Sequence, residues 1–485
     1  MRGVLVFGVL FTTFAWLKYR SALGRISAGI NWSPISFRFL TAHFCSIVLF
    51  GALYSGASSL ARSPYSSLLA GAWLATGLAA VSLAAFAFIP LIFWLRIIRE
   101  THFLWMWTAA AALAASLSGK AIQSLWPLAT EVTFRLTQLL LSQVVSGLIV
   151  DPGNFVIGTE RFTVQIAPVC SGLEGVALIV VFGIVWLAIF RDRCRFPHAL
   201  IVLPAGVILI FILNAVRIAA LVLIGNAGAE QIATRGFHSQ AGWMMFSLVA
   251  VSFSVAARNV QWLAIPEAND VKVGSFENPI TRWLLPFLMI LAAGMISAAM
   301  TGDFEWLYPL RFFAGGLTLA LMWRRYKDLD WRVGYLAPAF GIGVFLIWIG
   351  LDHFAAVAPE PIPAPLAAAS PLVRVLWLTF RVLGAIAIVP LAEELAFRGY
   401  LYRRLLSADF ESVSFRRFSL VALMASSLIF GVLHGNRWFV GAVAGAFYGL
   451  ALIRRGSIGD AVAAHATTNA LLAIDVLVFH QWHLW

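Results

Sequence analysis

Long apolar segments recur along nearly the whole chain of 485 residues, and this recurrence constrains the fold more than any other feature. The sequence is 61% hydrophobic and only 12% charged, so most of it belongs in a bilayer. The segments lie near 3–17, 38–60, 66–95, 103–118, 173–190, 197–224, 241–257, 283–300, 306–323, 334–351, 371–391, 418–434, 438–453 and 458–480. We therefore expect an all-α polytopic integral membrane protein with roughly 13–15 transmembrane helices, each of about 20 mostly apolar residues.

The net charge of +12 follows the same segments. Lys and Arg gather where apolar runs end, as at Arg324/Arg325 and Arg454/Arg455, and cytoplasmic loops carry such an excess. No basic patch interleaved with aromatic residues stands apart from an apolar run, so we expect no nucleic-acid binding.

One polar stretch divides the chain. Residues 263–279 carry four charges and two prolines and interrupt the apolar pattern. The sequence therefore predicts two helical-bundle domains, 1–262 and 282–485, joined by a linker over 263–281.

A short β-prone stretch precedes the first candidate site. In residues 154–166, two such runs flank Gly158-Thr159-Glu160, a pattern typical of a small hairpin. A hairpin here would hold Cys170 at the membrane surface and line a groove for an extended peptide. An ordinary external loop is the alternative.

Cys170, Arg217 and His238 are predicted to meet at one membrane face. Cys170 precedes the apolar run 173–190, which ends in the basic cluster 191–195, so the thiol lies at the external end. The chain recrosses from about residue 197, and this brings Asn214 and Arg217 back to that face. His238 follows in the short polar loop 226–240.

These residue types suit thiol acyl transfer. A thiol is a weak nucleophile until a base or cation activates it, and His238 could take the proton of Cys170. Arg217 could stabilise an oxyanion, and Asn214, three residues earlier on the same helix face, could orient it. Alternatively, Arg217 reaches lipid head groups and His238 is an ordinary loop residue.

The C-terminal half carries a second set of polar residues. Glu393 and Glu394 stand in an apolar stretch, and Arg398 follows Glu394 at i,i+4 spacing. Carboxylates inside a membrane helix are candidates for function. His434 follows Phe430, and Asn469 follows His465, again with helical i,i+4 spacing. The alternative is a polar network that only packs helices together.

The first set, in the order Cys170-Ser-Gly, Asn214-x-x-Arg217-Ile and His238 with Gly242, resembles the exosortase family over roughly residues 40–260. These bacterial membrane proteins process substrates that carry a C-terminal sorting signal. The resemblance implies that Cys170 is the nucleophile, His238 the general base or acid, and Arg217 the transition-state stabiliser.

The second set resembles the CAAX-prenyl-endopeptidase and bacteriocin-processing (CPBP) intramembrane proteases over roughly residues 285–480. The resemblance implies that Glu393 and His434 activate water and that His465 and Asn469 stabilise the oxyanion, with Glu394 and Arg398 in support. Zinc on Glu393, His434 and His465 is an open alternative, but no H-E-x-x-H occurs, so we expect no cofactor.

Together the halves resemble an E-type exosortase, whose substrates carry a short Val-Pro-Glu-Ile-Asp-like signal, an apolar helix and a basic tail. We expect a multi-pass enzyme of the bacterial inner membrane that cleaves such exported proteins and transfers the new carboxyl terminus to an acceptor. Simple hydrolysis is the alternative within enzymes. A polytopic transporter is the alternative from another class, although no inverted repeat is evident.

Overall fold

Helices dominate the computed structural model, which describes residues 36–59, 66–88, 90–265, 278–354 and 360–485 together with Phe11 and Tyr19. Within these residues, nine helices are long and apolar enough to cross a membrane, and two shorter apolar helices accompany them. The chain is thus an all-α polytopic membrane protein, as predicted. These nine long helices of the described residues are fewer than the roughly 13–15 transmembrane helices expected from the lengths of the apolar runs. The run at 3–17 contributes nothing to it, since it falls almost wholly outside the described residues.

The chain forms two compact units, Met1–Trp126 and Pro127–Trp485. The first contains α2 (Phe37–Ser59), α3 (Ser66–Phe88) and α4 (Leu91–Thr101), while α5 (Leu104–Ser142) begins in it and continues into the second. The predicted division at 263–281 stays a prediction, because residues 266–277 are outside the described part of the chain.

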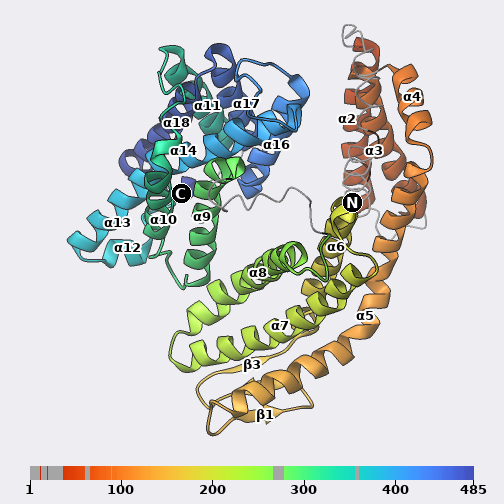
Figure 1. Cartoon of the computed structure of the whole chain (residues 1–485), viewed down its shortest axis with the longest axis vertical. Coiled ribbons are helices and arrows are strands. Elements are labelled where there is room, and N and C mark those ends of the chain that lie inside the picture. The colour runs from red at the N-terminus through yellow and green to blue at the C-terminus, as the bar shows by residue number, and fades with distance from the viewer. Residues whose placement is uncertain are drawn as a thin grey trace. The chain divides into compact units, whose positions relative to one another are not determined.

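A three-stranded antiparallel sheet follows α5, in the order β1 (Ile149–Asp151), β2 (Val156–Gly158) and β3 (Thr163–Gln165). The predicted hairpin is confirmed as β2 and β3, and β1 adds a third strand. The buried Ile157 side chain packs against Phe134 of α5 and Val222 of α7 (Val202–Asn226), which anchors the sheet between these helices (Figure 1). One edge of β3 has no neighbouring strand within the described sheet.

Three packed helices carry the first site: α6 (Leu173–Ile189), α7 and α8 (His238–Asn259). The 3-10 turn η1 (Pro168–Cys170) precedes α6, and η2 (Arg191–Arg193) and η3 (His198–Ile201) join α6 to α7.

The predicted polar loop at 226–240 is wrong. Only residues 227–229 separate α7 from the next helical residues, and the π-helical segment η4 (Ile232–Phe237) leads directly into α8. Two hydroxyls in this region bond to helix carbonyls, since the Thr234 hydroxyl donates to the Glu230 carbonyl and the Ser239 hydroxyl to the Arg235 carbonyl. Polarity alone therefore does not end a helix.

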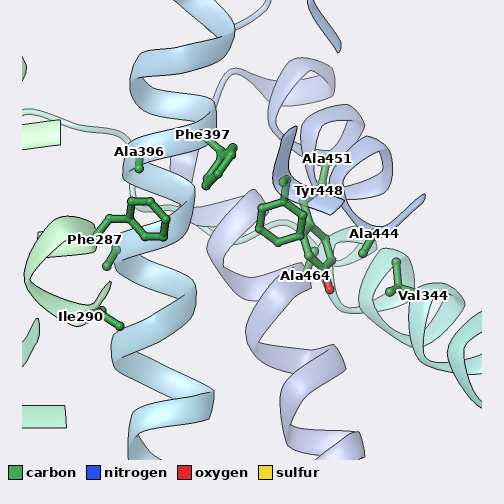
Figure 2. Close-up of a cluster of buried hydrophobic side chains, with 11 residues drawn as sticks. Phe287, Ile290, Val344, Ala396, Phe397, Ala444, Tyr448, Ala451 and Ala464 are labelled. Carbon is green, nitrogen blue, oxygen red and sulfur yellow. The ribbon is translucent and has the colours of Figure 1, made fainter. Parts of the chain in front are cut away.

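The C-terminal bundle carries the second site. Its elements are α9 (Pro279–Ala299), α10 (Pro309–Met322), η5 (Trp323–Arg325), α11 (Leu336–Phe354), α12 (Ala364–Ala368), α13 (Pro371–Leu383), η6 (Gly384–Ile388), α14 (Val389–Glu394), η7 (Leu395–Leu401), α15 (Tyr402–Leu406), α16 (Leu420–Val432), η8 (Gly435–Arg437), α17 (Trp438–Arg455), α18 (Ile458–Phe479) and η9 (Trp482–Leu484). Helices α11, α16, α17 and α18 pack together (Figure 1). Figure 2 shows Phe287, Phe397 and Tyr448 in the apolar core of this bundle.

Candidate active sites

Cys170 is held at the start of α6 by local backbone structure. Its N–H donates to the Ala167 carbonyl at 2.8 Å, and the Ser171 carbonyl accepts from the Thr133 hydroxyl of α5 at 3.0 Å. Gly172 then adopts φ +88, a conformation that favours glycine. A Cβ at Gly172 would lie 3.0 Å from Asn214 Nδ2, so glycine lets the chain pass this close to α7 without a movement of Asn214.

The predicted first-site residues come together. Cys170 Sγ lies 4.0 Å from His238 Nε2, and Arg217 Nη2 lies 3.4 Å from His238 Nδ1 and donates to the His238 carbonyl at 2.5 Å. Asn214 connects α7 to the turn that holds Cys170, since it donates to the Cys170 carbonyl at 2.9 Å and accepts from Arg217, also on α7, at 3.2 Å. A thiol, an imidazole and a guanidinium therefore share one site, with Asn214 as its clamp.

The thiol is not activated by its surroundings alone. Burial raises the pKa of Cys170 above its ordinary value, and the nearby Arg217 charge lowers it only in part. At neutral pH the thiol therefore keeps its proton until a base removes it. His238 Nε2 can accept this proton in the tautomer that carries the ring hydrogen on Nδ1.

Two cavities flank Cys170 and His238, and they differ in character. The first, about 330 Å³, also contains Arg217 and is lined on its apolar side by residues such as Leu178, Trp243 and Phe246. The second, about 320 Å³, runs along β3 and includes Thr163, Val164 and Gln165. The sulfur thus lies between a helix-lined space with both polar and apolar walls and a largely apolar space along the edge of the sheet.

At the second site, Glu394 forms the centre of a buried ion network. Its carboxylate lies 2.9 Å from His465 Nδ1 and 3.0 Å from Arg398 Nε, and all three side chains are buried. Arg398 also donates to the Gly445 carbonyl at 2.7 Å and lies over the Phe430 ring. The predicted pairing of Glu394 with Arg398 is present, and His465 joins it.

Glu393 makes weaker contacts than Glu394. Its carboxylate lies 3.9 Å from His465 Nε2, which is too long for a hydrogen bond, and its side chain keeps 15% of its exposure. His434 Nδ1 lies 3.0 Å from the Phe430 carbonyl oxygen, and Asn469 donates to the Ala385 carbonyl at 2.7 Å. The structure therefore brings Glu393 and Glu394 to His465, whereas His434 and Asn469 bond to backbone carbonyls.

The depth of these residues follows from helix length. Glu393 lies ten residues before Arg403, or about 15 Å along a helix, and His434 lies fourteen residues after Leu420, or about 20 Å. The helix α16 has only 13 residues, which is shorter than the about 20 that span a bilayer, so His434 follows a short helix. The π-helical segments η6 and η7 occur on either side of the Glu pair, and such segments are frequent at functional sites.

Sequence reasoning missed Tyr448, whose ring stacks on His465 with 4.6 Å between centroids. A signal was available in the spacing Gly441-x-x-x-Gly445-x-x-x-Gly449, which marks a face for close helix packing. A Cβ at Gly445 would come within 2.9 Å of the Ser427 backbone of α16. This glycine stripe lets α16 and α17 approach and places Tyr448 over the imidazole.

The zinc alternative lacks a converging set of ligands. No group of three His, Cys, Asp or Glu side chains suited to a metal ion occurs in the part of the chain that the structure describes. His465 faces Glu394 and Glu393 with its two nitrogens, while His434 Nδ1 faces the Phe430 carbonyl. These side chains do not fit a zinc site.

Two family models match this chain. The model described as transmembrane exosortase matches residues 3–255, and the model described as type II CAAX prenyl endopeptidase Rce1-like matches residues 375–471. The first match contains the Cys170 site, and the second contains the Glu393 site. Comparisons with curated proteins and with solved structures give no match.

Proposed function

The chain belongs to the transmembrane exosortase family and is a membrane enzyme acting on peptide bonds, and we propose that it cleaves C-terminal sorting signals of exported proteins by thiol acyl transfer at Cys170. The observation that carries this proposal is the position of Cys170 between two unlike cavities. A substrate of this class continues from an extended motif into an apolar helix, and each part has a matching space.

The edge of β3 supports binding of the extended motif. An extended peptide can add a strand to an open sheet edge, where main-chain hydrogen bonds give affinity. β3 lines the same cavity as Cys170 and His238, so a peptide bound there would present its scissile bond to the thiol. The apolar helix that follows would contact Trp243 and Phe246 in the first cavity.

The proposed reaction proceeds through a tetrahedral intermediate to a thioester. His238 takes the proton of Cys170 while sulfur bonds to the scissile carbonyl carbon, and the tetrahedral intermediate carries the negative charge on oxygen. Arg217 Nε is a buried donor without a hydrogen-bond partner among the described residues, and it can bond this oxyanion. The C–N bond then breaks, His238 returns the proton to the leaving amine, and a thioester remains on Cys170.

The thioester needs a second nucleophile. Transfer to an amine acceptor gives a transpeptidase, whereas attack by water gives a simple hydrolase. Leu178, Trp243 and Phe246 line part of the first cavity, and an apolar substrate segment bound against them would limit the access of water to the thioester, which favours transfer. A transporter is the remaining alternative, and the family membership argues against it.

For the second site we infer an intramembrane endopeptidase that works without a metal. Glu393 together with His434 activates the attacking water, and His465 and Asn469 stabilise the oxyanion. Glu394 and Arg398 keep His465 in place through the buried network. The freedom of Glu393 from that network supports its role, because a base must be able to accept a proton.

The proposed location is the bacterial inner membrane, with Cys170 on the outer side. The basic residues Arg191, Arg193 and Arg195 follow α6, whereas Cys170 precedes it, so the positive-inside rule supports this orientation. The two sites would then belong to domains 1–262 and 282–485, joined by the linker 263–281.

The test is processing of a tagged exported reporter that ends in a signal motif, an apolar helix and a basic tail. Cys170→Ala should abolish processing while the enzyme still accumulates in the membrane, and Arg217→Lys should be severely impaired because a point charge does not replace the planar fork. Near-normal processing by Cys170→Ala would exclude the thiol mechanism. Glu393→Gln should leave this thiol-dependent cleavage at least partly active.

A further inference from the structure

A third cavity, lined by residues of the C-terminal bundle, lies apart from both active sites. We call it the basic pocket. It encloses about 530 Å³ and is lined by Arg282 of α9, Arg403 of α15, the loop residues Glu411, Ser414 and Arg416, and Gly456 after α17. The proposed mechanism uses none of these residues.

Arg403 is the fixed cation of the basic pocket. Its side chain is only 4% exposed, its Nε donates to the Gly399 carbonyl at 2.6 Å, and its guanidinium lies over the rings of Trp283 and Phe415 at 4.7 and 4.4 Å. Its Nη2 has no hydrogen-bond partner among the described residues. A buried donor without a partner is costly, so an acceptor from outside the chain would stabilise it.

Arg282 offers a second unused donor. Its Nη2 pairs with Glu411, and its Nε is buried without a partner in the described part of the chain. Arg416 is exposed at the rim and donates through Nε to the Arg455 carbonyl. Three arginines against Asp328 and Glu411 leave the lining with a positive balance, which suits an anion.

The residues around the basic pocket indicate the chemical class of the anion. The same end of the bundle carries Arg324, Arg325, Arg404, Arg417, Arg454 and Arg455, and such an excess marks the cytoplasmic surface, at the level of lipid head groups. Arginine binds phosphate well because its planar guanidinium can donate two hydrogen bonds to two phosphate oxygens. We propose that the basic pocket binds a phosphate group, with Arg403 and Arg282 as its inner donors and Arg416 at the rim.

The test uses the full-length enzyme and separates a lipid head group from free phosphate. One arm adds inorganic phosphate to the protein in detergent and follows the apparent melting temperature. The other arm compares nanodiscs of phosphatidylcholine with and without phosphatidylglycerol, and counts retained lipid by native mass spectrometry. Stabilisation in the first arm identifies free phosphate, and stabilisation or lipid retention only in the second identifies a head group.

Arg416→Gln should weaken the effective binding about tenfold, since one charge-assisted hydrogen bond is lost. Arg403→Lys should weaken it as well, and its folding is checked by its yield in the membrane. Arg404→Gln is the matched control, because Arg404 is exposed and does not line the basic pocket. Absence of binding in both arms, or equal binding by Arg416→Gln and Arg404→Gln, would overturn the proposal.

Discussion

Replacing Gly172 with alanine should damage the thiol site while leaving the helix bundle folded. Gly172 has φ +88, and an L-residue in this conformation costs about 1–2 kcal/mol. The new Cβ would also lie 3.0 Å from Asn214 Nδ2, so Asn214 must move by a few tenths of an ångström. Asn214 bonds both the Cys170 carbonyl and Arg217, and its movement would therefore displace both groups.

The expected effect on rate is larger than the effect on stability. A displacement of 1 Å can cost about a hundredfold in rate, so a shift of a few tenths predicts a loss of roughly tenfold in kcat/KM. The assay is the initial rate of reporter cleavage in proteoliposomes at equal enzyme content. The apparent melting temperature of each variant is measured beside it.

Gly147→Ala is the matched control. Gly147 has φ +83, so it carries similar backbone strain, but nothing lies within 4 Å of the position of its Cβ. Both variants should lose comparable stability, and only Gly172→Ala should lose cleavage rate. Equal rates for Gly172→Ala and wild type, or an equal loss in both variants, would refute the reasoning that Asn214 transmits the change.

Three further outcomes are expected. Glu394→Gln should lower the free energy of unfolding by about 3–5 kcal/mol, because it leaves Arg398 buried without its charged partner. Glu393→Gln should keep the melting temperature of the wild type and lose only the second activity. Equal melting temperatures for the two variants would contradict the buried network. The second outcome concerns a variant whose only cysteine is Cys170. Adding Arg217→Gln should shift the pH at which the thiol alkylation rate rises to a higher value, since the Arg217 charge lowers the pKa of Cys170. An unchanged pH profile would exclude an effect of Arg217 on the Cys170 thiol. The same single-cysteine protein should react with a membrane-impermeant thiol reagent in intact spheroplasts, and labelling only after lysis would place Cys170 on the cytoplasmic side.

Much of the first site could be predicted from the sequence because apolar run length determines where the chain crosses the membrane. The ends of the runs that became α6 and α7 placed Cys170, Asn214 and Arg217 at one face, and the structure joins them by hydrogen bonds. His238 was assigned to a loop, although it begins α8, because its polar neighbours resemble a loop while their hydrogen bonds keep them helical. Its place beside Cys170 was still correct.

The second site shows the limit of local spacing. The i,i+4 pattern paired Glu394 with Arg398 correctly, since both lie on one turn of the same helix. The approach of His465 to Glu394 and the stacking of Tyr448 on His465 could not be predicted in this way, because these residues lie on three different helices, α14, α17 and α18. Helix rotation and depth depend on packing, here on the glycine stripe of α17 and the short length of α16.

The sequence by itself thus determined the membrane class, the order of the crossings and the residue types at each site, because these depend on hydrophobicity and on spacing along one helix. Only the tertiary structure decided which glutamate is held in the ion network and which remains free. It also decided that Cys170 lies between a cavity along a sheet edge and a second cavity lined by α6, α7 and α8. These features arise from contacts between segments distant in the chain, where side-chain shape and close packing select one arrangement among many.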